Sequence, residues 1–330
     1  MNTTEKLVSL GICFSDKDKL ELEKAGCALS QYDAAGDLEE ALAAAKDAAA
    51  VCVSNVWMRH LPPDFLGRLE KCRLLVVGST GTDTIDADDA ALRGISIANC
   101  PRYSAPAVAE HAFALLLSLA RRLNNRPERP SDPGLVSYTA AVTLRKGVEL
   151  RGKTLGIAGY GHVGWHLARL ASGFGMKVLV AKRNPPWLLS RLIRHRHAKF
   201  VKFGAMLTQS DAVVSVVPPG VRGLFDAEAF GRMRPGCLFV NVGRAQALDE
   251  EALHSALENG IVGGAGLDAF SPAGAQALRP LRNVILSPHM AWNTAEAEGR
   301  LGRECVKNIT SFFAGKPVNL VMDASRTQEE

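Results

Sequence analysis

The chain has 330 residues, 47% of them hydrophobic and 22% charged, a length for about two domains and the composition of a globular rather than a disordered protein. Its 39 basic and 34 acidic side chains leave a formal net charge of +5. This excess is too small to indicate a nucleic-acid or membrane partner, and we expect neither.

The first hundred residues alternate short strand-like runs with helical patterns. The predicted strands are 8–14, 27–31, 50–54, 74–78 and 95–99. The predicted helices are 16–25, 38–48, 61–71 and 86–92. Strands and helices alternating at this spacing are typical of a parallel sheet covered by helices.

Residues 107–123 predict a helix that is apolar on nearly all sides, so we expect it to be buried between larger units. The apolar run is interrupted by Glu110 and His111 and is shorter than the roughly 20 residues that span a bilayer. The next stretch, 124–138, is rich in Pro, Asn, Asp and Ser and predicts a linker or surface loop. The alternation of strands and helices restarts at 152, and a last helix is expected at 294–313.

A glycine motif follows the predicted strand 153–158 and precedes a predicted helix, 165–174, and a further strand, 176–181. Its residues are Gly159, Tyr160, Gly161, His162, Val163 and Gly164. In this context Gly159 permits a tight turn, Gly161 lets a pyrophosphate approach the backbone, and Gly164 allows close packing of helix on strand. The motif therefore predicts a dinucleotide site with the phosphates at the helix N-terminus.

The second strand of this unit ends in Lys182 and Arg183, where an NAD-selective site usually has an acidic residue that binds the ribose hydroxyls. Two cations suit a 2′-phosphate instead. We therefore expect NADP as the preferred cofactor, with NAD as the alternative. The basic stretch that follows, 185–202, is interpreted as a solvated helix rather than as an anion site.

Eight segments resemble a known family, the D-isomer-specific 2-hydroxyacid dehydrogenases, over about residues 50–320. They are GTDTID (81–86), AVAEH (107–111), ELRGKTLGI (149–157), MRPG (233–236), NVGR (241–244), DEEAL (249–253), GLDAF (266–270) and SPHMAW (287–292). The resemblance implies an α/β fold in which a Rossmann doubly wound parallel sheet domain, 104–291, is inserted into a flavodoxin-like substrate-binding domain, 1–103 and 292–330. It also implies a homodimer.

The resemblance further implies hydride transfer between a nicotinamide and a small 2-oxo or 2-hydroxy acid of the glyoxylate or hydroxypyruvate class. Arg244 and His289 match the family's catalytic arginine and its acid–base histidine. The implied substrate-binding residues are Asn55, Thr80, Gly81, Arg244 and Trp292. The implied cofactor contacts beyond the glycine motif and the two cations are Pro218, Val242, Gly243, Arg244, Asp268 and His289.

One family element is missing. The family pairs its histidine with a glutamate five residues after the aspartate that Asp268 matches, and this chain has Ala273 there. A carboxylate from elsewhere, such as Glu296 or Glu298, or an anion of the substrate could replace it. Two alternatives stay open: a biosynthetic dehydrogenase of a phosphorylated or phosphonylated 2-hydroxy acid, and a catalytically weakened dinucleotide-binding regulatory protein.

Seven cysteines are scattered along the chain without a CxxC pair, as in proteins of a reducing compartment. No secretion signal stands at the N-terminus. We therefore expect a cytoplasmic protein, and we predict no metal site because no cluster of ligands has the spacing of one.

Overall fold

The computed structural model describes residues 4–33, 36–123, 146–183 and 197–324. The chain divides into two compact units, one of Met1–Ser104 with Asn293–Glu330 and one of Ala105–Trp292, which we call the split unit and the central unit. The sequence analysis placed both boundaries one residue earlier. The predicted linker 124–138 and most of the basic stretch 185–202 lie outside the described residues.

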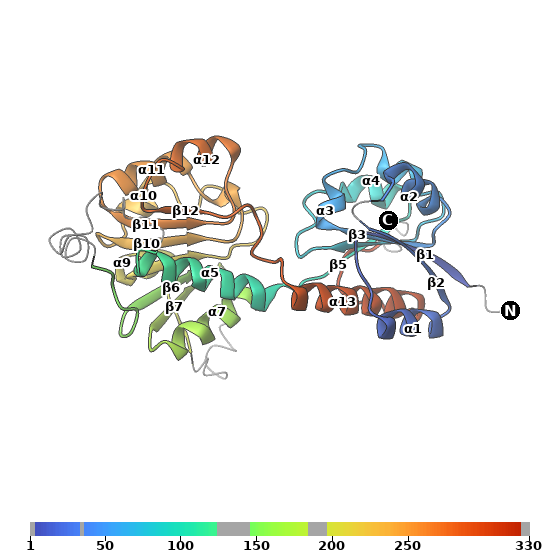
Figure 1. The fold of residues 1–330 in the computed structure, drawn as a ribbon, viewed down its shortest axis with the longest axis horizontal. Helices are drawn as coiled ribbons and strands as arrows, with labels where there is room; N and C mark the ends of the chain where they lie inside the picture. The colour runs from blue at the N-terminus through green and yellow to red at the C-terminus, as the bar shows by residue number, and fades with distance from the viewer. Residues whose placement is uncertain (1–3, 34–35, 124–145, 184–196, 325–330) are drawn as a thin grey trace, which may run out of the picture. The chain divides into compact units, whose positions relative to one another are not determined.

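The split unit, blue to cyan and dark red in Figure 1, has a six-stranded sheet in the order β13-β5-β4-β3-β1-β2. Only β13 runs antiparallel to its neighbour. The strands are β1 (Glu5–Leu10), β2 (Cys27–Tyr32), β3 (Ala50–Ser54), β4 (Leu74–Gly78), β5 (Ser96–Asn99) and β13 (Leu320–Met322). Every residue of β3 and β4 is buried, as expected of strands covered on both faces.

Helices cover both faces of this sheet, with α1 and α13 on one side and α2, α3 and α4 on the other (Figure 1). Their bounds are α1 (Asp16–Lys24), α2 (Leu38–Ala45), α3 (Asn55–Met58), α4 (Ala87–Leu92) and α13 (Ala295–Phe313). The central strand order 2-1-3-4-5 is that of flavodoxin-like sheets.

The predicted helix 61–71 is wrong. The structure has the short α3 before it and a 3₁₀ helix, η1 (Phe65–Arg68), within it. The double proline at 62–63 has no backbone N–H to donate, and the Phe65 N–H bonds to the Pro62 carbonyl in a single tight turn. The apolar periodicity is real, because Phe65, Leu66 and Leu69 are buried, but a 3₁₀ turn is enough to bury them.

The central unit, green to orange in Figure 1, has a seven-stranded sheet in the order β12-β11-β10-β9-β6-β7-β8. All its strand pairs are parallel. The strands are β6 (Thr154–Ala158), β7 (Lys177–Ala181), β8 (Lys199–Phe200), β9 (Ala212–Ser215), β10 (Cys237–Asn241), β11 (Val262–Leu267) and β12 (Val284–Leu286). The chain adds β7 and β8 on one side of β6 and then β9 to β12 on the other side. Doubly wound sheets bind their ligands at the point where the strand order reverses in this way, here between β6 and β9.

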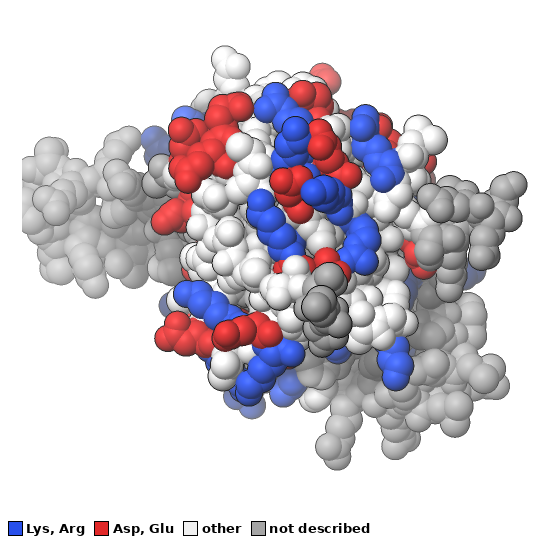
Figure 2. Space-filling model, turned by 90° about the vertical axis from the view of Figure 1, so that its right-hand side faces the viewer, with Lys and Arg blue, Asp and Glu red and all other residues white. Residues whose placement is uncertain are grey.

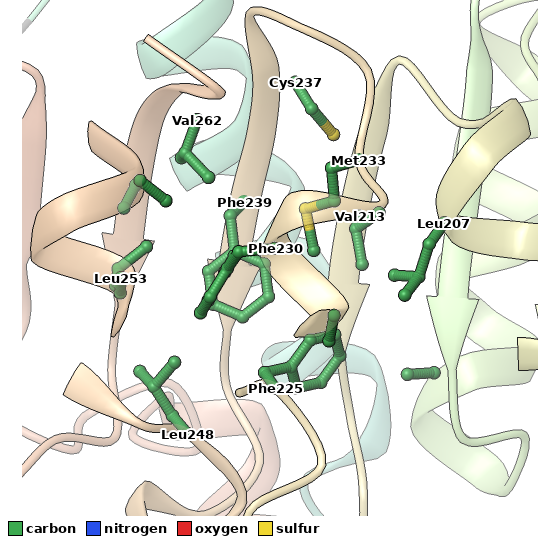
Figure 3. Close-up of a cluster of buried hydrophobic side chains, with 14 of the residues drawn as sticks. Leu207, Val213, Phe225, Phe230, Met233, Cys237, Phe239, Leu248, Leu253 and Val262 are labelled. Carbon is green, nitrogen blue, oxygen red and sulfur yellow. The ribbon is translucent and has the colours of Figure 1, made fainter. Parts of the chain in front are cut away.

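Two hydrophobic cores lie on the two faces of this sheet. One lies under α5 (Ala105–Ala120) and α7 (His162–Gly173). The other lies under α9 (Phe203–Gln209), α10 (Ala227–Gly231), α11 (Glu250–Glu258) and α12 (Pro272–Leu278). Figure 3 shows the aromatic centre of the second core, where the ring centroids of Phe225 and Phe239 lie 4.9 Å apart and those of Phe230 and Phe239 5.4 Å apart. Edge-to-face packing of this kind holds the sheet rigid beneath its loops.

Basic and acidic side chains are interspersed on the face of the molecule in Figure 2, which shows no large area of one sign. Among the described residues, no helix is both long enough and apolar enough to cross a membrane.

Candidate active site

The glycine motif forms the turn between β6 and α7, at the carboxyl edge of the central sheet. Gly159 has φ +97°, and a Cβ added there would lie 2.9 Å from the Val216 carbonyl oxygen, so only glycine fits. A Cβ on Gly164 would lie 2.7 Å from the Gly159 carbonyl oxygen, because the first turn of α7 packs on this loop. A Cβ on Gly161 would meet nothing within 4 Å. The turn leaves open space before the helix N-terminus, whose N–H groups and dipole favour a phosphate.

The other three residues of the motif have different surroundings. Tyr160 is half-buried with its ring edge toward Phe200, the centroids 5.2 Å apart, and burial raises the pKa of its phenol. His162 is exposed as the first residue of α7, and Val163 packs against the core beneath that helix. The tyrosine therefore presents a neutral hydroxyl beside the glycine turn at physiological pH.

Lys182 and Arg183 follow β7 directly and are exposed. Because β7 pairs in parallel with β6, both cations emerge at the same sheet edge as the glycine turn. Pro218 is exposed at the end of the neighbouring β9, and the buried Gly243 packs so closely there that an added Cβ would lie 2.9 Å from the Val217 carbonyl oxygen. The structure thus brings these predicted cofactor contacts to one edge.

Asn241, the last residue of β10, joins the ends of two strands. Its fully buried side-chain Nδ2 donates to the carbonyls of Arg244 (3.2 Å) and Ala269 (3.1 Å), and its Oδ1 accepts from the Gly243 N–H (3.2 Å). Arg244 follows on this turn, half-buried, with Nη1 donating to the Gly243 carbonyl at 3.2 Å. The sequence analysis did not assign Asn241 a role, although a polar residue ending a buried strand was a signal for one.

Asp268 follows β11 and is only 3% exposed. Its carboxylate accepts hydrogen bonds from the backbone N–H groups of Met290 (2.9 Å) and Ala291 (3.0 Å). These are the two residues after His289, and the Trp292 indole Nε1 donates to the His289 carbonyl at 3.0 Å. Asp268, predicted as a cofactor contact, therefore binds the turn that carries the histidine.

Three predicted substrate residues belong to the split unit. Asn55 follows β3, and Thr80 and Gly81 follow β4, its parallel neighbour in the sheet. Asn99 Nδ2 donates to the Thr80 carbonyl at 2.7 Å, and Thr80 Oγ1 donates to the Cys100 carbonyl at 3.4 Å. The structure thus brings these three residues together on the carboxyl edge of the split unit, while Arg244, His289 and Trp292 lie on the central unit.

Comparison with known proteins identifies the family. The family model described as "D-isomer specific 2-hydroxyacid dehydrogenase, NAD binding domain" matches residues 113–291, more than half of the chain. The chain belongs to this family. This dehydrogenase is 30% identical to a hydroxypyruvate reductase of Blautia hydrogenotrophica, over 96% of the chain and 99% of that protein. It is 33% identical to a glyoxylate reductase of Thermococcus litoralis, over 78% and 79% of the two.

Among solved structures, a glyoxylate reductase from Paecilomyes thermophila is 26% identical to the dehydrogenase, with a TM-score of 0.77 over 96% of this chain and 98% of that one. The predicted family and fold class are confirmed, and so is the predicted activity class, an oxidoreductase that transfers a hydride to a 2-oxo acid or from a 2-hydroxy acid.

Ala273 is exposed near the start of α12, where the family has its glutamate. A carboxylate of α11 lies beside the start of this helix: Glu250 accepts a hydrogen bond from the Ser271 N–H at 2.6 Å and another from the Ser271 hydroxyl. Ser271 in turn accepts from the Gly274 N–H at 2.9 Å and caps α12. Glu250 thus stabilises the start of the helix that carries Ala273. No group of three or more His, Cys, Asp or Glu side chains among the described residues could hold a metal.

Proposed function

We propose that the dehydrogenase reduces glyoxylate or hydroxypyruvate, and that Arg244 and His289 are its catalytic residues. The observation that carries the proposal is the placement of both on turns that follow β10 and β12, at the same sheet edge as the glycine turn. A dinucleotide with its phosphates before α7 extends along this edge toward the two residues. The proposed contacts are Gly159, Tyr160, Gly161, His162, Val163, Gly164, Lys182, Arg183, Pro218, Val242, Gly243 and Asp268.

Each catalytic residue has its own task in this proposal. The Arg244 guanidinium binds the substrate carboxylate through two parallel N–H groups and polarises the 2-oxo oxygen. His289 donates a proton to that oxygen as it becomes a hydroxyl. The bound reduced nicotinamide supplies the hydride to C2, so the acid gains one hydride and one proton. Further proposed substrate contacts are the N–H groups of Thr80 and Gly81, Asn55 and Trp292.

We propose NADP as the preferred cofactor, with NAD as the alternative. Lys182 and Arg183 supply the positive charge that a 2′-phosphate requires at the end of β7. The test is kcat/KM with NADPH against NADH, for the wild type and for the double variant Lys182→Asp, Arg183→Ser. A wild type that prefers NADH would overturn this part of the proposal.

The substrate class is tested by NADPH oxidation with glyoxylate, hydroxypyruvate, pyruvate and a phosphorylated 2-oxo acid. Turnover of glyoxylate or hydroxypyruvate supports the proposal. Turnover of the phosphorylated acid alone favours the biosynthetic alternative, in which a substrate anion takes the place of the carboxylate missing at Ala273. Cofactor binding without turnover of any acid favours the regulatory alternative.

We further propose that the protein is a cytoplasmic homodimer. Its central unit exposes two large apolar side chains, Trp165 (41%) and Phe174 (48%), at the two ends of α7, and burial of these side chains against a second copy would stabilise a dimer. Light scattering coupled to gel filtration tests the dimer, and a monomer at micromolar concentration would refute it.

A further inference from the structure

The turn that carries His289 is held in a backbone conformation that needs support. His289 has φ +54°, in the left-handed region that a residue with a side chain rarely adopts. Such a conformation is strained and persists only where the surroundings impose it. The His289 N–H bonds to the Ser287 carbonyl at 2.9 Å, which closes the turn on itself but does not anchor it to the sheet.

Two groups anchor the turn to the end of β11: the Leu267 carbonyl, which accepts from the Ser287 N–H at 2.9 Å, and the Asp268 carboxylate. Besides the N–H groups of Met290 and Ala291, the carboxylate accepts a hydrogen bond from the Ser287 hydroxyl at 2.7 Å. Both ends of the turn, one before His289 and one after it, are therefore bound to a single buried side chain. Asp268 is thus the side chain that contacts the turn on both sides of the histidine.

A third residue completes the arrangement. His111 Nε2 lies 2.9 Å from the Ser287 hydroxyl oxygen and 3.6 Å from Asp268 Oδ1. The serine hydroxyl has one proton, and it donates that proton to a carboxylate that can only accept. His111 must therefore be protonated at Nε2 and donate to Ser287. The hydrogen bonds run in one direction, from His111 to Ser287 to Asp268.

His111 belongs to α5, which packs against β10, β11 and β12. Its side chain is 24% exposed, and its ring extends from a long buried helix toward the end of the sheet. From the sequence, this histidine was only a residue that interrupts the apolar run of the helix and the last residue of the family segment 107–111. Its contacts in the structure are instead with the two residues that fix the turn of the acid–base histidine.

We infer that His111, Ser287 and Asp268 are positioning residues that hold His289 in its productive orientation, with the His111 N–H fixing the serine hydroxyl on the aspartate. The inference rests on the proposed role of His289 as the proton donor. It assigns to α5 a support of the backbone that carries His289, which is distinct from a carboxylate paired with the histidine ring.

The test compares His111→Leu, which removes the donor, with His111→Gln, whose amide N–H can reach a similar position. In His111→Leu we expect kcat to fall about 10- to 100-fold, the effect of misplacing a catalytic group, while KM for the cofactor stays within about twofold. His111→Gln should retain kcat within about threefold of the wild type, because the donor is kept. His254→Leu is the matched control, since His254 lies 3.5 Å from Glu258 and is 31% exposed, yet lies on α11 away from this turn.

A second measurement does not need activity. In the cofactor-free protein, hydrogen exchange of the peptide spanning 287–292 should be about two- to tenfold faster in His111→Leu than in the wild type, as loss of one hydrogen bond implies, and unchanged in His254→Leu. If the melting temperature of His111→Leu is well below that of His254→Leu, the variant is destabilised as a whole, and Ser287→Ala is measured in its place. Its control is Ser210→Ala, which removes another buried hydroxyl, one that bonds to the Met206 carbonyl.

The outcomes separate the inference from the proposed function. Unchanged kcat and unchanged exchange in His111→Leu, in an active enzyme, would overturn the inference and leave the proposed function standing. A wild type without turnover of any 2-oxo acid would overturn the proposed function, and the exchange measurement would still decide whether His111 holds the turn.

Discussion

The second glycine of the motif gives a sharp test of the dinucleotide site. Gly161→Ala adds a methyl group where nothing lies within 4 Å, at φ −107°, which alanine can adopt. The only cost to folding is a poorer helix N-cap, less than about 1 kcal/mol. In the presence of a dinucleotide the same methyl occupies the space through which a phosphate reaches the backbone N–H groups.

The size of the effect follows from the hydrogen bonds that are lost. A hydrogen bond from an N–H group to a charged oxygen contributes about 1.5–3 kcal/mol. Loss of one such bond should therefore raise the Kd for NADPH roughly 10- to 150-fold.

Gly173→Ala is the matched control. It adds a methyl at the other end of α7, again with nothing within 4 Å, and should raise the free energy of unfolding by about 0.4–1 kcal/mol without changing the Kd. Fluorescence titration with NADPH and thermal unfolding without it give both quantities. A Gly161→Ala protein that binds within about threefold of the wild type would refute a pyrophosphate at this turn.

Three further predictions concern Gly164 and Arg244 of the central unit and Glu304 of the split unit. Gly164→Ala should lower the free energy of unfolding by about 1–3 kcal/mol in urea, because its Cβ would lie 2.7 Å from the Gly159 carbonyl oxygen; an unchanged midpoint would contradict that contact. Arg244→Lys, which loses the paired N–H groups but keeps the charge, should lower kcat/KM about 100-fold with an unchanged melting temperature, and wild-type activity would exclude Arg244 as the carboxylate ligand. Burial raises the pKa of Glu304 above its ordinary value of 4.5 despite hydrogen bonds from the N–H groups of Arg102 and Tyr103. The folded state therefore binds this proton more tightly than the unfolded state, and the contribution of Glu304 to stability falls as the pH rises from its ordinary pKa through the raised one. Glu304→Gln should accordingly be more stable relative to the wild type at pH 7 than at pH 4.5 in urea unfolding, and the opposite order would show that the hydrogen bonds outweigh burial.

The fold was predictable from the sequence because the central strands of both sheets are parallel and buried. The strands at 50–54 and 74–78 are continuous apolar runs, and the structure has them at the predicted bounds. The predicted helix 165–174 begins earlier, at His162, because a helix that starts against a glycine turn has no apolar periodicity in its first turn. The helix predicted at 61–71 failed because apolar spacing cannot distinguish a helix from a short turn that buries the same side chains.

The sequence predicted the candidate site residues that lie at strand ends. It did not predict the side chains that hold those residues in place through hydrogen bonds. Strand ends are found from local sequence, and a parallel sheet brings them to one edge. The hydrogen bond of His111 to Ser287 spans 176 positions in the sequence, and that of Ser271 to Glu250 spans 21. No local pattern indicates such pairs, because they depend on which helix packs across which strand.

The hydrogen bonds of Asn241 have a consequence for anyone who wishes to engineer a different substrate range. Its amide joins the arginine loop to the loop after β11 through the carbonyls of Arg244 and Ala269. In a library that varies the arginine loop alone, the loop after β11 stays as it is, and we expect most variants to break the hydrogen bonds of Asn241. The position of the Arg244 guanidinium would then change. Redesign of this enzyme should therefore vary the two loops as one unit and leave the asparagine between them untouched.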